Sequence, residues 1–457
     1  MFLHGERLYI GIVEINPPLA FYLTVPALWL ADLTGLTDTA AFITYTTLLC
    51  AISSLLLLLV LQRSDLSAPA QRELFLASLI GLFVLPMADF GQREHLMLAF
   101  GLSYFFLLIL GEEVQTLPFA SRFAIGLIAA FGLALKPYFL LIPTLIVLAG
   151  PIRSLPKRVI DPANLGLGFG LLAYLAFIIL AHPAYLAAIV PIASKVYSSF
   201  GSSWSGVLLR SEIGGVICLC GAFLAILKHG GGITLRLLAG LGASVLCYLV
   251  QFKGWNYQIV PTTFFLTLGA IWLLHVSPIS RRREILPGLL AILAVFLGLG
   301  RQIERGPYVS IYADSFAQFV DRPSKSILVL SSNVSAAFPF VNEVRGRWSS
   351  RYPAQWLVPG ALVGKQRTDC HILPAECKEF ERILVNARTA IVEDLLRHDP
   401  DLVFIDGRIN KSYFEGVEFD YIDFLRGDSR FVRLWSRYQL QGKVQGYQVW
   451  SKAASGI

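Results

Sequence analysis

Five short groups of polar residues interrupt the apolar segments between residues 14 and 257, and they hold the side chains that could do chemistry. Polar groups beside apolar membrane helices are costly unless they have a function. Carboxylates among them could act as acids or bases, and basic side chains could hold a phosphate. The groups are residues 14–18, 89–95, 136–138, 182–195 and 253–257. The candidate catalytic residues are Glu14, Asp89 and Glu94, and the candidate substrate-binding residues are Asn16, Gln92, Arg93, His95, Lys136, Tyr138, Lys253, Trp255 and Tyr257.

Glu14 lies just before Pro17 and Pro18, which are suited to the first turn of a helix. Its carboxylate could take a proton from an acceptor hydroxyl if partial desolvation moves its pKa towards the working pH. An acidic residue near a helix N-terminus is also favoured by the helix dipole alone. The position of Glu14 therefore suits a catalytic base and a structural residue alike.

Residues 89–95 form the densest polar run beside the apolar segments. Arg93 could pair with a lipid phosphate, because its planar guanidinium matches phosphate oxygens. Asp89 and Glu94 could act as acid, base or ligands of a divalent cation, and His95 could donate a hydrogen bond to a phosphate oxygen. The alternative is a solvated turn with an internal Arg–Glu pair, and the need for any metal stays open.

Two further groups combine lysines with aromatic residues. Lys136 could bind a phosphate at the membrane face, or it could simply extend to the lipid head groups. Lys253 could also hold a phosphate, while Trp255 and Tyr257 could stack on sugar rings or serve as interfacial belt residues. Residues 182–205 could form an amphipathic cap over a lipid groove, and no catalytic role is predicted for them.

Long apolar segments must position these groups. The 457-residue chain is 55% hydrophobic and 15% charged, with mean hydropathy +0.62, whereas soluble proteins carry about 25% charged residues. Segments long enough to cross a ~30 Å hydrocarbon core predict a polytopic α-helical membrane protein of about 10–11 spans. The net charge of +7 comes from dispersed residues, which argues against a nucleic-acid partner. The predicted spans are residues 38–62, 73–88, 95–111, 120–135, 138–150, 162–181, 206–227, 233–250, 259–276 and 285–300, and residues 17–35 are predicted to form an interfacial or re-entrant helix.

Basic residues in alternate loops predict the orientation of these spans. Lys and Arg concentrate in cytoplasmic loops, and one set of alternate loops carries eleven of them without any polar motif. The other set holds all five polar groups, which should therefore face the periplasm from a bacterial inner membrane. Because both chain ends then lie outside, a first helix upstream of residue 1 is expected. The eleven basic residues are Arg63, Arg72, Arg122, Arg153, Lys157, Arg158, Lys228, Arg236, Arg281, Arg282 and Arg283.

The composition changes near residue 301, and the rest of the chain is predicted to form a small external α/β domain. Residues 326–330 and 401–407 have the pattern of buried strands followed by turns. Residues 379–398 have helical spacing, and residues 446–450 could form an edge strand. The predicted domains are an external loop and interfacial helix at 1–37, a transmembrane domain at 38–300 and the α/β domain at 301–457.

Cys370 and Cys377 lie in the predicted external domain, and their spacing suits a local disulfide in an oxidising compartment. The alternative is a metal site, for which only His371 accompanies the two thiols. The other four cysteines lie within apolar runs and are interpreted as small core residues.

Glu14 followed by the sequence Pro17-Pro18-Leu19 resembles a motif of the GT-C superfamily, in which an acidic residue in the first external loop precedes a Pro-Pro-Leu helix start. These integral-membrane glycosyltransferases use polyprenyl-phosphate-linked sugars, as the dolichyl-phosphate-mannose and aminoarabinose transferases do. The resemblance covers residues 5–260 and implies that Glu14 is the catalytic base. Many relatives carry Asp near the position of Gly11, so the second polar group also stays a candidate source of the catalytic carboxylate.

The resemblance implies an inverting glycosyltransferase that moves a sugar from a polyprenyl-phosphate donor to a lipid, glycan or protein acceptor on the periplasmic face. Arg93, Lys136 and Lys253 would neutralise the leaving phosphate. The chain has no Walker loop and no Gly-x-Ser-x-Gly motif, which agrees with a donor that arrives activated. The alternatives are an O-antigen ligase or polymerase, a transporter or flippase of lipid-linked sugars, and a scaffold. Transport is disfavoured because the charges gather at one face.

Overall fold

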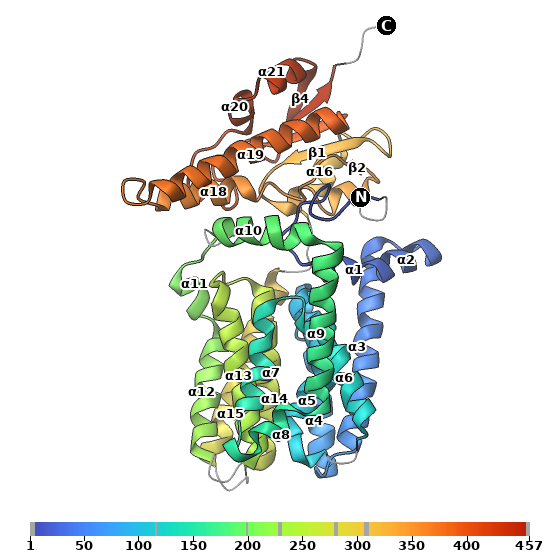
Figure 1. The fold of residues 1–457 in the computed structure, drawn as a ribbon, viewed down its shortest axis with the longest axis vertical. Helices are drawn as coiled ribbons and strands as arrows, with labels where there is room; N and C mark the ends of the chain where they lie inside the picture. The colour runs from blue at the N-terminus through green and yellow to red at the C-terminus, as the bar shows by residue number, and fades with distance from the viewer. Residues whose placement is uncertain are drawn as a thin grey trace. The chain divides into compact units, whose positions relative to one another are not determined.

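The computed structural model of the protein describes residues 5–114, 117–197, 200–226, 231–277, 282–305 and 310–453. The chain forms two compact units, a helical unit and a sheet unit (Figure 1). Lys228 and Arg281, two of the basic loop residues counted above, lie outside the described residues. The helical unit comprises Asn16–Ala181 and Gly201–Pro307, and the sheet unit comprises Met1–Ile15, His182–Phe200 and Tyr308–Ile457.

The helices of the helical unit follow the predicted apolar segments, and each predicted span overlaps one of them. The helices that overlap the predicted spans are α3 (Asp38–Gln62), α4 (Ala68–Phe83), α5 (Arg93–Leu110), α6 (Phe119–Leu133), α7 (Leu141–Leu148), α9 (Pro162–Ala181), α12 (Ser211–Ile226), α13 (Gly231–Gln251), α14 (Val260–Val276) and α15 (Arg282–Arg305). The other helices of the unit are α1 (Pro18–Tyr22), α2 (Val25–Thr34), α8 (Leu155–Val159) and α11 (Trp204–Leu208).

Several of these helices begin at residues that satisfy free backbone N–H groups. The Thr37 side chain accepts a hydrogen bond from the N–H of Ala40 at the start of α3, and Ser67 does the same for Ala70 in α4. Pro18 stands in the first turn of α1, where its missing N–H costs nothing. The predicted helix over residues 17–35 is therefore present as two short helices, α1 and α2.

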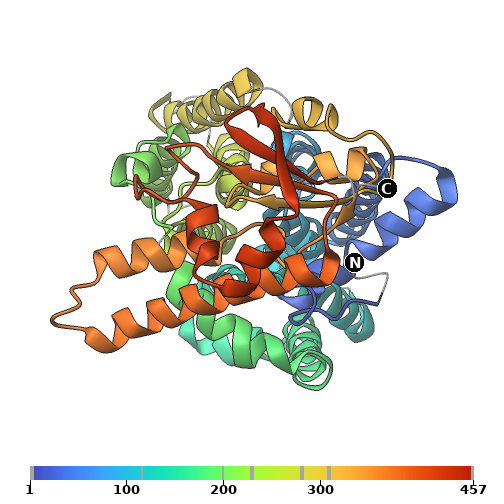
Figure 2. The same ribbon diagram turned by 90° about the horizontal axis from the view of Figure 1, so that it is seen from above.

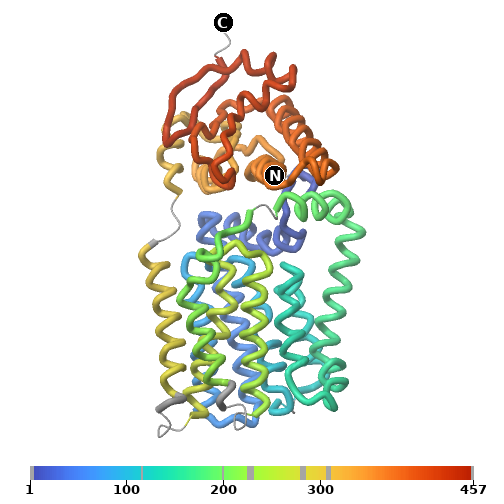
Figure 3. The backbone as a smooth tube through the Cα atoms, turned by 90° about the vertical axis from the view of Figure 1, so that its left-hand side faces the viewer, coloured from blue at the N-terminus to red at the C-terminus, as the bar shows by residue number. Residues whose placement is uncertain are grey.

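The helices of this unit differ in burial. Almost every residue of α5 and α14 is buried, because α5 packs against α3, α6 and α13 and α14 packs against α4, α13 and α15. The helices α3, α9 and α15 instead expose large apolar side chains such as Leu55, Leu172 and Phe296. Figure 3 shows α9 and α15 on opposite sides of the unit. Apolar surface of this extent is expected to face lipid.

Six helices within the described ranges are long and apolar enough to cross a membrane, and a bent pair, Pro137–Leu148 with Ile152–Val159, would make a seventh span. The bend between the members of this pair is 114°. Helices α6 and α12 are apolar but shorter. These features are those of a multi-pass helical membrane protein.

The sheet unit contains a five-stranded sheet with the order β2-β1-β3-β5-β4. Strand β1 is parallel to β2 and β3, while β5 is antiparallel to β3 and β4. All residues of β1 and β3 are buried, as expected of parallel strands covered on both faces. The strands are β1 (Ser326–Leu330), β2 (Arg347–Trp348), β3 (Leu402–Asp406), β4 (Tyr438–Val444) and β5 (Tyr447–Lys452).

Alternate residues of the central strands enter two cores. Leu328 and Val403 join a core with the helices of one face, and Val329 and Phe404 join a core with aromatic residues on the other face. Helices α18 and α19 pack side by side in this unit (Figure 2), and the predicted disulfide between Cys370 and Cys377 is present at their connection. The unit's helices are α10 (Val190–Val196), α16 (Ala313–Ala317), α17 (Phe340–Glu343), α18 (Leu357–Arg367), α19 (Pro374–His398), α20 (Tyr421–Arg426) and α21 (Ser429–Trp435).

Three expectations for the soluble part differ from the structure. Residues 446–450 were expected at the sheet edge, but β5 lies between β3 and β4, and the polar, largely exposed β4 is the edge. The C-terminal segment of the sheet unit starts later than residue 301, because α15 continues to Arg305 in the helical unit. Residues His182–Phe200 belong to the sheet unit, where Val196 of α10 is buried in the core.

Candidate functional site

Three of the five predicted polar groups meet within the helical unit. The Nζ atom of Lys136 lies 2.5 Å from Oε1 of Glu94, and both side chains are buried. The same Nζ atom lies 5.0 Å from the centre of the Tyr257 ring. The loops after α4, α6 and α13 therefore converge at one end of this unit. We call Arg93, Glu94, Lys136, Tyr138, Lys253, Trp255 and Tyr257 the Lys136 cluster.

Local backbone structure explains how these side chains reach the cluster. Gln92 is extended and precedes α5, so Glu94 lies in the first turn, where the helix dipole favours a carboxylate. Lys136 is extended because Pro137 follows it. Lys253 stands before Gly254, whose φ of +64° is readily available only to glycine. A Cβ atom on Gly254 would also lie 3.1 Å from the carbonyl oxygen of Gly206.

Positive charge exceeds negative charge in the Lys136 cluster. Burial lowers the pKa of Lys253 to about 7, and the nearby charges of Lys136 and Arg93 act in the same direction. Burial also lowers the pKa of Lys136 to about 8, although Glu94 opposes this change. Three basic side chains thus interact around one paired carboxylate, which is an arrangement suited to an anionic ligand.

Two buried polar atoms of the cluster have no hydrogen-bond partner in the described part of the chain. They are Oε2 of Glu94 and the hydroxyl oxygen of Tyr138. An unsatisfied buried polar group costs about 1–3 kcal/mol. Nearby, the rings of Trp255 and Tyr257 lie 5.6 Å apart, and Nζ of Lys253 lies 4.7 Å from the Trp255 ring centre. The cluster therefore combines basic groups, unsatisfied polar atoms and aromatic faces.

A second set of charges, which the sequence analysis missed, supports the Lys253 loop. Arg210 donates hydrogen bonds of 3.2 Å to the carbonyl oxygen of Gly254 and 3.3 Å to Oδ1 of Asn256. Glu212 is buried and receives Arg210 at 3.4 Å and Arg301 at 2.8 Å. The sequence contains one indication of this set: Glu212 places a carboxylate at the start of the apolar segment that forms α12.

Other residues of the 89–95 group take different positions. His95 is buried, its Nδ1 accepts the N–H of Gly91 at 2.9 Å, and its Nε2 lies 3.5 Å from Sγ of Cys50. Both ring nitrogens thus contact the protein, which suits a role in holding the turn before α5. Asp89 is half-buried at the end of a short turn of 3₁₀ helix, and Gln92 is exposed.

Glu14 and Asn16 lie on either side of the boundary between the units. Glu14 belongs to the sheet unit, where its Oε1 accepts the N–H of Ile15 at 2.9 Å. The preceding residue, Val13, donates its N–H to the carbonyl oxygen of Arg351 in the same unit. Asn16 is the first residue of the helical unit and is half-buried. The structure therefore describes Glu14 and the Lys136 cluster in separate units.

An apolar groove of about 280 Å³ lies on the helical unit between α1, α6 and α9. Its wall includes Leu19, whose N–H donates to the hydroxyl of Tyr174 at 3.1 Å. The groove reaches Ala134, two residues before Lys136. It is lined by Leu19, Tyr22, Leu127, Ala130, Phe131, Ala134, Gly170, Ala173, Tyr174 and Phe177.

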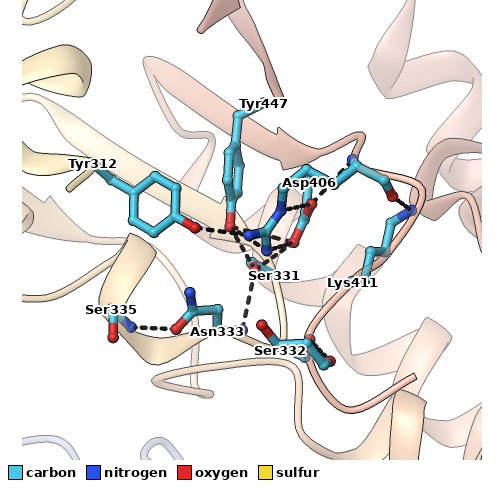
Figure 4. A network of polar contacts seen from close by, with 10 residues as sticks. Tyr312, Ser331, Ser332, Asn333, Ser335, Asp406, Lys411 and Tyr447 are labelled. Carbon is cyan, nitrogen blue, oxygen red and sulfur yellow. Dashed lines mark hydrogen bonds and ion pairs between the residues drawn. The ribbon is translucent and has the colours of Figure 1, made fainter. Parts of the chain in front are cut away.

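The sheet unit contains a different polar network at the ends of β1 and β3 (Figure 4). Asp406 accepts hydrogen bonds from Arg408 at 2.6 and 2.8 Å, from Ser331 at 2.9 Å and from Tyr447 at 3.3 Å. Arg408 also donates to the hydroxyl of Tyr312 at 2.7 Å. Because the buried carboxylate is fully bonded within the protein, this network is suited to fixing the turns after the two strands.

No group of three or more His, Cys, Asp or Glu side chains with a metal-binding arrangement occurs among the residues that the structure describes. The proposed divalent cation thus has no ligand set there that the structure identifies. No protein-family model matches the chain, and no curated protein or solved structure is similar to it.

Proposed function

We propose that the helical unit carries the donor site of a membrane glycosyltransferase that uses a polyprenyl-phosphate-linked sugar. The observation that carries this proposal is the Lys136 cluster, in which Arg93, Lys136 and Lys253 interact around one buried carboxylate. A leaving phosphate gains negative charge as its bond to the sugar breaks, and fixed cations in a buried site stabilise that charge. The aromatic rings of Trp255 and Tyr257 are suited to contact the sugar.

The apolar groove supports a donor with a long hydrocarbon chain. It lies two residues along the chain from Lys136, so one ligand could place its phosphate in the cluster and its isoprenoid chain in the groove. Burial of each CH₂ group of such a chain contributes about 0.8 kcal/mol. A soluble nucleotide-sugar would use the basic cluster alone.

In the proposed reaction, the acceptor hydroxyl oxygen attacks the anomeric carbon of the sugar. The bond between that carbon and the phosphate oxygen breaks, and its electron pair leaves with the phosphate. A carboxylate takes the proton of the attacking hydroxyl. Displacement from the opposite side inverts the anomeric centre, and the products are the glycosylated acceptor and the polyprenyl phosphate.

We assign the base to Glu14 or Asp89 and a positioning role to Glu94. Glu94 is buried and bonded to Lys136, so its available negative charge already serves to hold that lysine. Asp89 and Glu14 are both half-buried, which leaves them accessible to an acceptor. The acceptor is a lipid, glycan or protein, and the sheet unit is a candidate for its recognition.

The sidedness of the reaction follows from the positive-inside rule and belongs to the same proposal. The helical unit would cross a bacterial inner membrane with its long apolar helices, and the Lys136 cluster would face the periplasm. An oxidising periplasm agrees with the disulfide between Cys370 and Cys377 in the sheet unit.

Mass spectrometry of lipid-linked and envelope glycans tests the proposal in cells with and without the gene. Loss of one sugar, restored by the wild-type protein but not by Lys136→Gln, is expected. Lys365→Gln is the matched control, because Lys365 also pairs with a glutamate but is exposed in the sheet unit. The variants Glu14→Gln and Asp89→Asn then identify the base. A glycan profile that is unchanged without the gene would contradict the proposal and favour transport or scaffolding.

A further inference from the structure

A polar cavity lies at the end of the helical unit opposite the Lys136 cluster. Helix α5 begins at Arg93 in the cluster and ends at Leu110 beside the cavity, so the two places are about 27 Å apart along its axis. The cavity measures about 510 Å³. Its charged lining consists of the basic residues Arg122, Lys157, Arg158 and Arg236 and the acidic residues Glu112, Glu113 and Asp161.

One arginine of this cavity, Arg122, forms a salt bridge and hydrogen bonds within the protein. Arg122 binds both carboxylate oxygens of Asp161, at 3.2 and 2.5 Å, and donates to the carbonyl oxygen of Val114 at 2.9 Å. Asp161 also accepts the N–H of Ala163 at 2.9 Å. This pair therefore neutralises itself, and each of the three guanidinium nitrogens of Arg122 already donates one hydrogen bond within the protein.

Arg158 and Arg236 are bonded in another way. Arg158 donates to the carbonyl oxygens of Val147 and Pro151, at 2.8 and 3.1 Å, and Arg236 donates to that of Ile109 at 2.8 Å. These bonds satisfy carbonyl groups at the ends of α7 and α5 and in the turn after α7, and Arg158 also donates to the hydroxyl of Ser154, but none of these bonds neutralises the positive charges. Neither guanidinium forms a salt bridge with a carboxylate in the described residues.

The charges of Arg158 and Arg236 also oppose one another, and the carboxylates of Glu112 and Glu113 offset part of the charge of Arg236. Nη2 of Arg158 and Nε of Arg236 are buried without a hydrogen-bond partner among the described residues. Both unsatisfied atoms are donors, so a ligand that relieves them must supply acceptor oxygens and negative charge. Glu112 and Glu113 line the same cavity but are exposed to solvent, where their attraction is screened.

Glycines hold both guanidinium groups close to the backbone. A Cβ atom on Gly111 would lie 2.3 Å from Nη1 of Arg236, and one on Gly232 would lie 2.9 Å from Nη2. A Cβ atom on Gly150 would lie 3.0 Å from Nη1 of Arg158. Glycine leaves room for the guanidinium groups at these positions, and their hydrogen bonds to backbone carbonyls orient them before a ligand binds, which lowers the cost of binding.

We propose that Arg158 and Arg236 form a binding site for a phosphate-bearing anion at this end of the helical unit. Arginine matches phosphate oxygens through paired N–H donors, and a phosphate would screen the repulsion between the two guanidinium groups. The phosphate belongs either to an anionic lipid head group or to a soluble phosphate compound. This site is independent of the proposed transferase site and would persist if that proposal failed.

Hydrogen exchange of the full-length protein in nanodiscs tests the site and separates the two sources. In one arm, nanodiscs of phosphatidylcholine receive inorganic pyrophosphate; in the other, phosphatidylglycerol replaces part of the phosphatidylcholine. We expect one arm to slow exchange of the backbone amides in residues 151–161 by about tenfold or more. Protection by pyrophosphate identifies a soluble ligand, and protection by phosphatidylglycerol identifies a lipid head group.

Variants show whether the protection depends on the proposed residues. Arg158→Gln and Arg236→Gln should each abolish it, and Arg158→Lys should weaken it because lysine keeps the charge without the paired donors. Arg153→Gln is the matched control, since Arg153 lies in the same linker, is exposed and does not line the cavity. Exchange in α14 reports whether each variant is folded. Absence of protection in both arms, or equal protection in the folded variants, would overturn the proposal.

Discussion

Two buried carboxylates, Asp406 in the sheet unit and Glu94 in the helical unit, are each 1% exposed but are bonded very differently. Asp406 accepts hydrogen bonds from Arg408, Ser331 and Tyr447. Glu94 is bonded by Lys136 through one oxygen, and its other oxygen has no partner in the described residues.

The charged residues around the two carboxylates also differ. Asp406 forms a salt bridge with Arg408 and also interacts with the charge of Lys411, whereas Glu94 stands among Arg93, Lys136 and Lys253. A saturated buried network stabilises a fold. A buried network with unsatisfied polar atoms and excess charge destabilises the fold, and a ligand that bonds to these groups restores stability. The comparison therefore assigns a structural role to the Asp406 network and a binding role to the Lys136 cluster.

The largest expected effect is the loss of sugar transfer in Lys136→Gln. Removing one cation that stabilises the leaving phosphate should lower kcat by at least ~100-fold. Because Glu94 would then be an unpaired buried charge, the double variant Glu94→Gln with Lys136→Gln keeps the test independent of misfolding. Transfer assays in nanodiscs measure both. Near-wild-type kcat in the folded double variant would assign the cluster a structural role as well.

Asp406→Asn should affect stability and leave the donor site unchanged. It removes the charge that pairs with Arg408, which should destabilise the sheet unit by about 3 kcal/mol. Denaturant unfolding followed by tryptophan fluorescence measures this change. The dissociation constant of polyprenyl phosphate should stay within about twofold of wild type. A large loss of donor affinity would show that the Asp406 network also takes part in donor binding.

The pH dependence of donor binding should reflect Lys253, whose pKa is lowered to about 7. The protonated lysine attracts phosphate, so the KM for the donor should rise by up to about tenfold per pH unit above pH 7. Lys253→Arg keeps its charge over this range and should remove the rise that begins near pH 7, which leaves the later rise from Lys136, whose pKa is lowered to about 8. Because the pKa in the unfolded chain is about 10.4, the native protein should also gain stability as the pH rises from about 7 towards 10. An unchanged pH profile in Lys253→Arg would exclude Lys253 as the titrating group.

The smallest effects come from deleting one hydroxyl in each region. Tyr138→Phe removes an unsatisfied buried hydroxyl and should leave stability unchanged or slightly higher, while weakening donor binding. Tyr447→Phe removes a hydroxyl bonded to Asp406 and should cost about 1 kcal/mol of stability without changing donor binding. Thermal unfolding and donor titration of both variants measure the contrast. The reverse pattern would mean that the two regions have exchanged roles.

The sequence was sufficient to predict the long helices and the central strands. Runs such as 38–62 and 326–330 are apolar enough to be recognised alone, and they correspond to α3 and β1. Strand β4 was missed because its residues are polar and largely exposed, so its position depends on pairing with β5. The placement of residues 182–200 depends on tertiary packing of Val196, which no local pattern contains.

Only part of the candidate site could be predicted, because local sequence patterns do not contain long-range contacts. The loops containing Glu94, Lys136 and Lys253 were found because charged residues interrupt apolar segments. The support given by Arg210 and Arg301 to this region was missed, because it links residues about 45 to 90 positions apart. The internal bonding of His95 to Gly91 and Cys50 also depends on folded geometry.

Binding of polyprenyl phosphate compared with uncharged polyprenol tests the central claim most directly. Both ligands would be titrated into the full-length protein in phosphatidylcholine nanodiscs, with the wild type, Lys253→Gln and the exposed control Lys365→Gln. We expect the phosphate to bind the wild type and the control at least ~100-fold more tightly than polyprenol, and Lys253→Gln to lose about tenfold of that preference. Equal affinities of the two ligands for the wild type, or an unchanged preference in Lys253→Gln, would contradict a phosphate site in the Lys136 cluster.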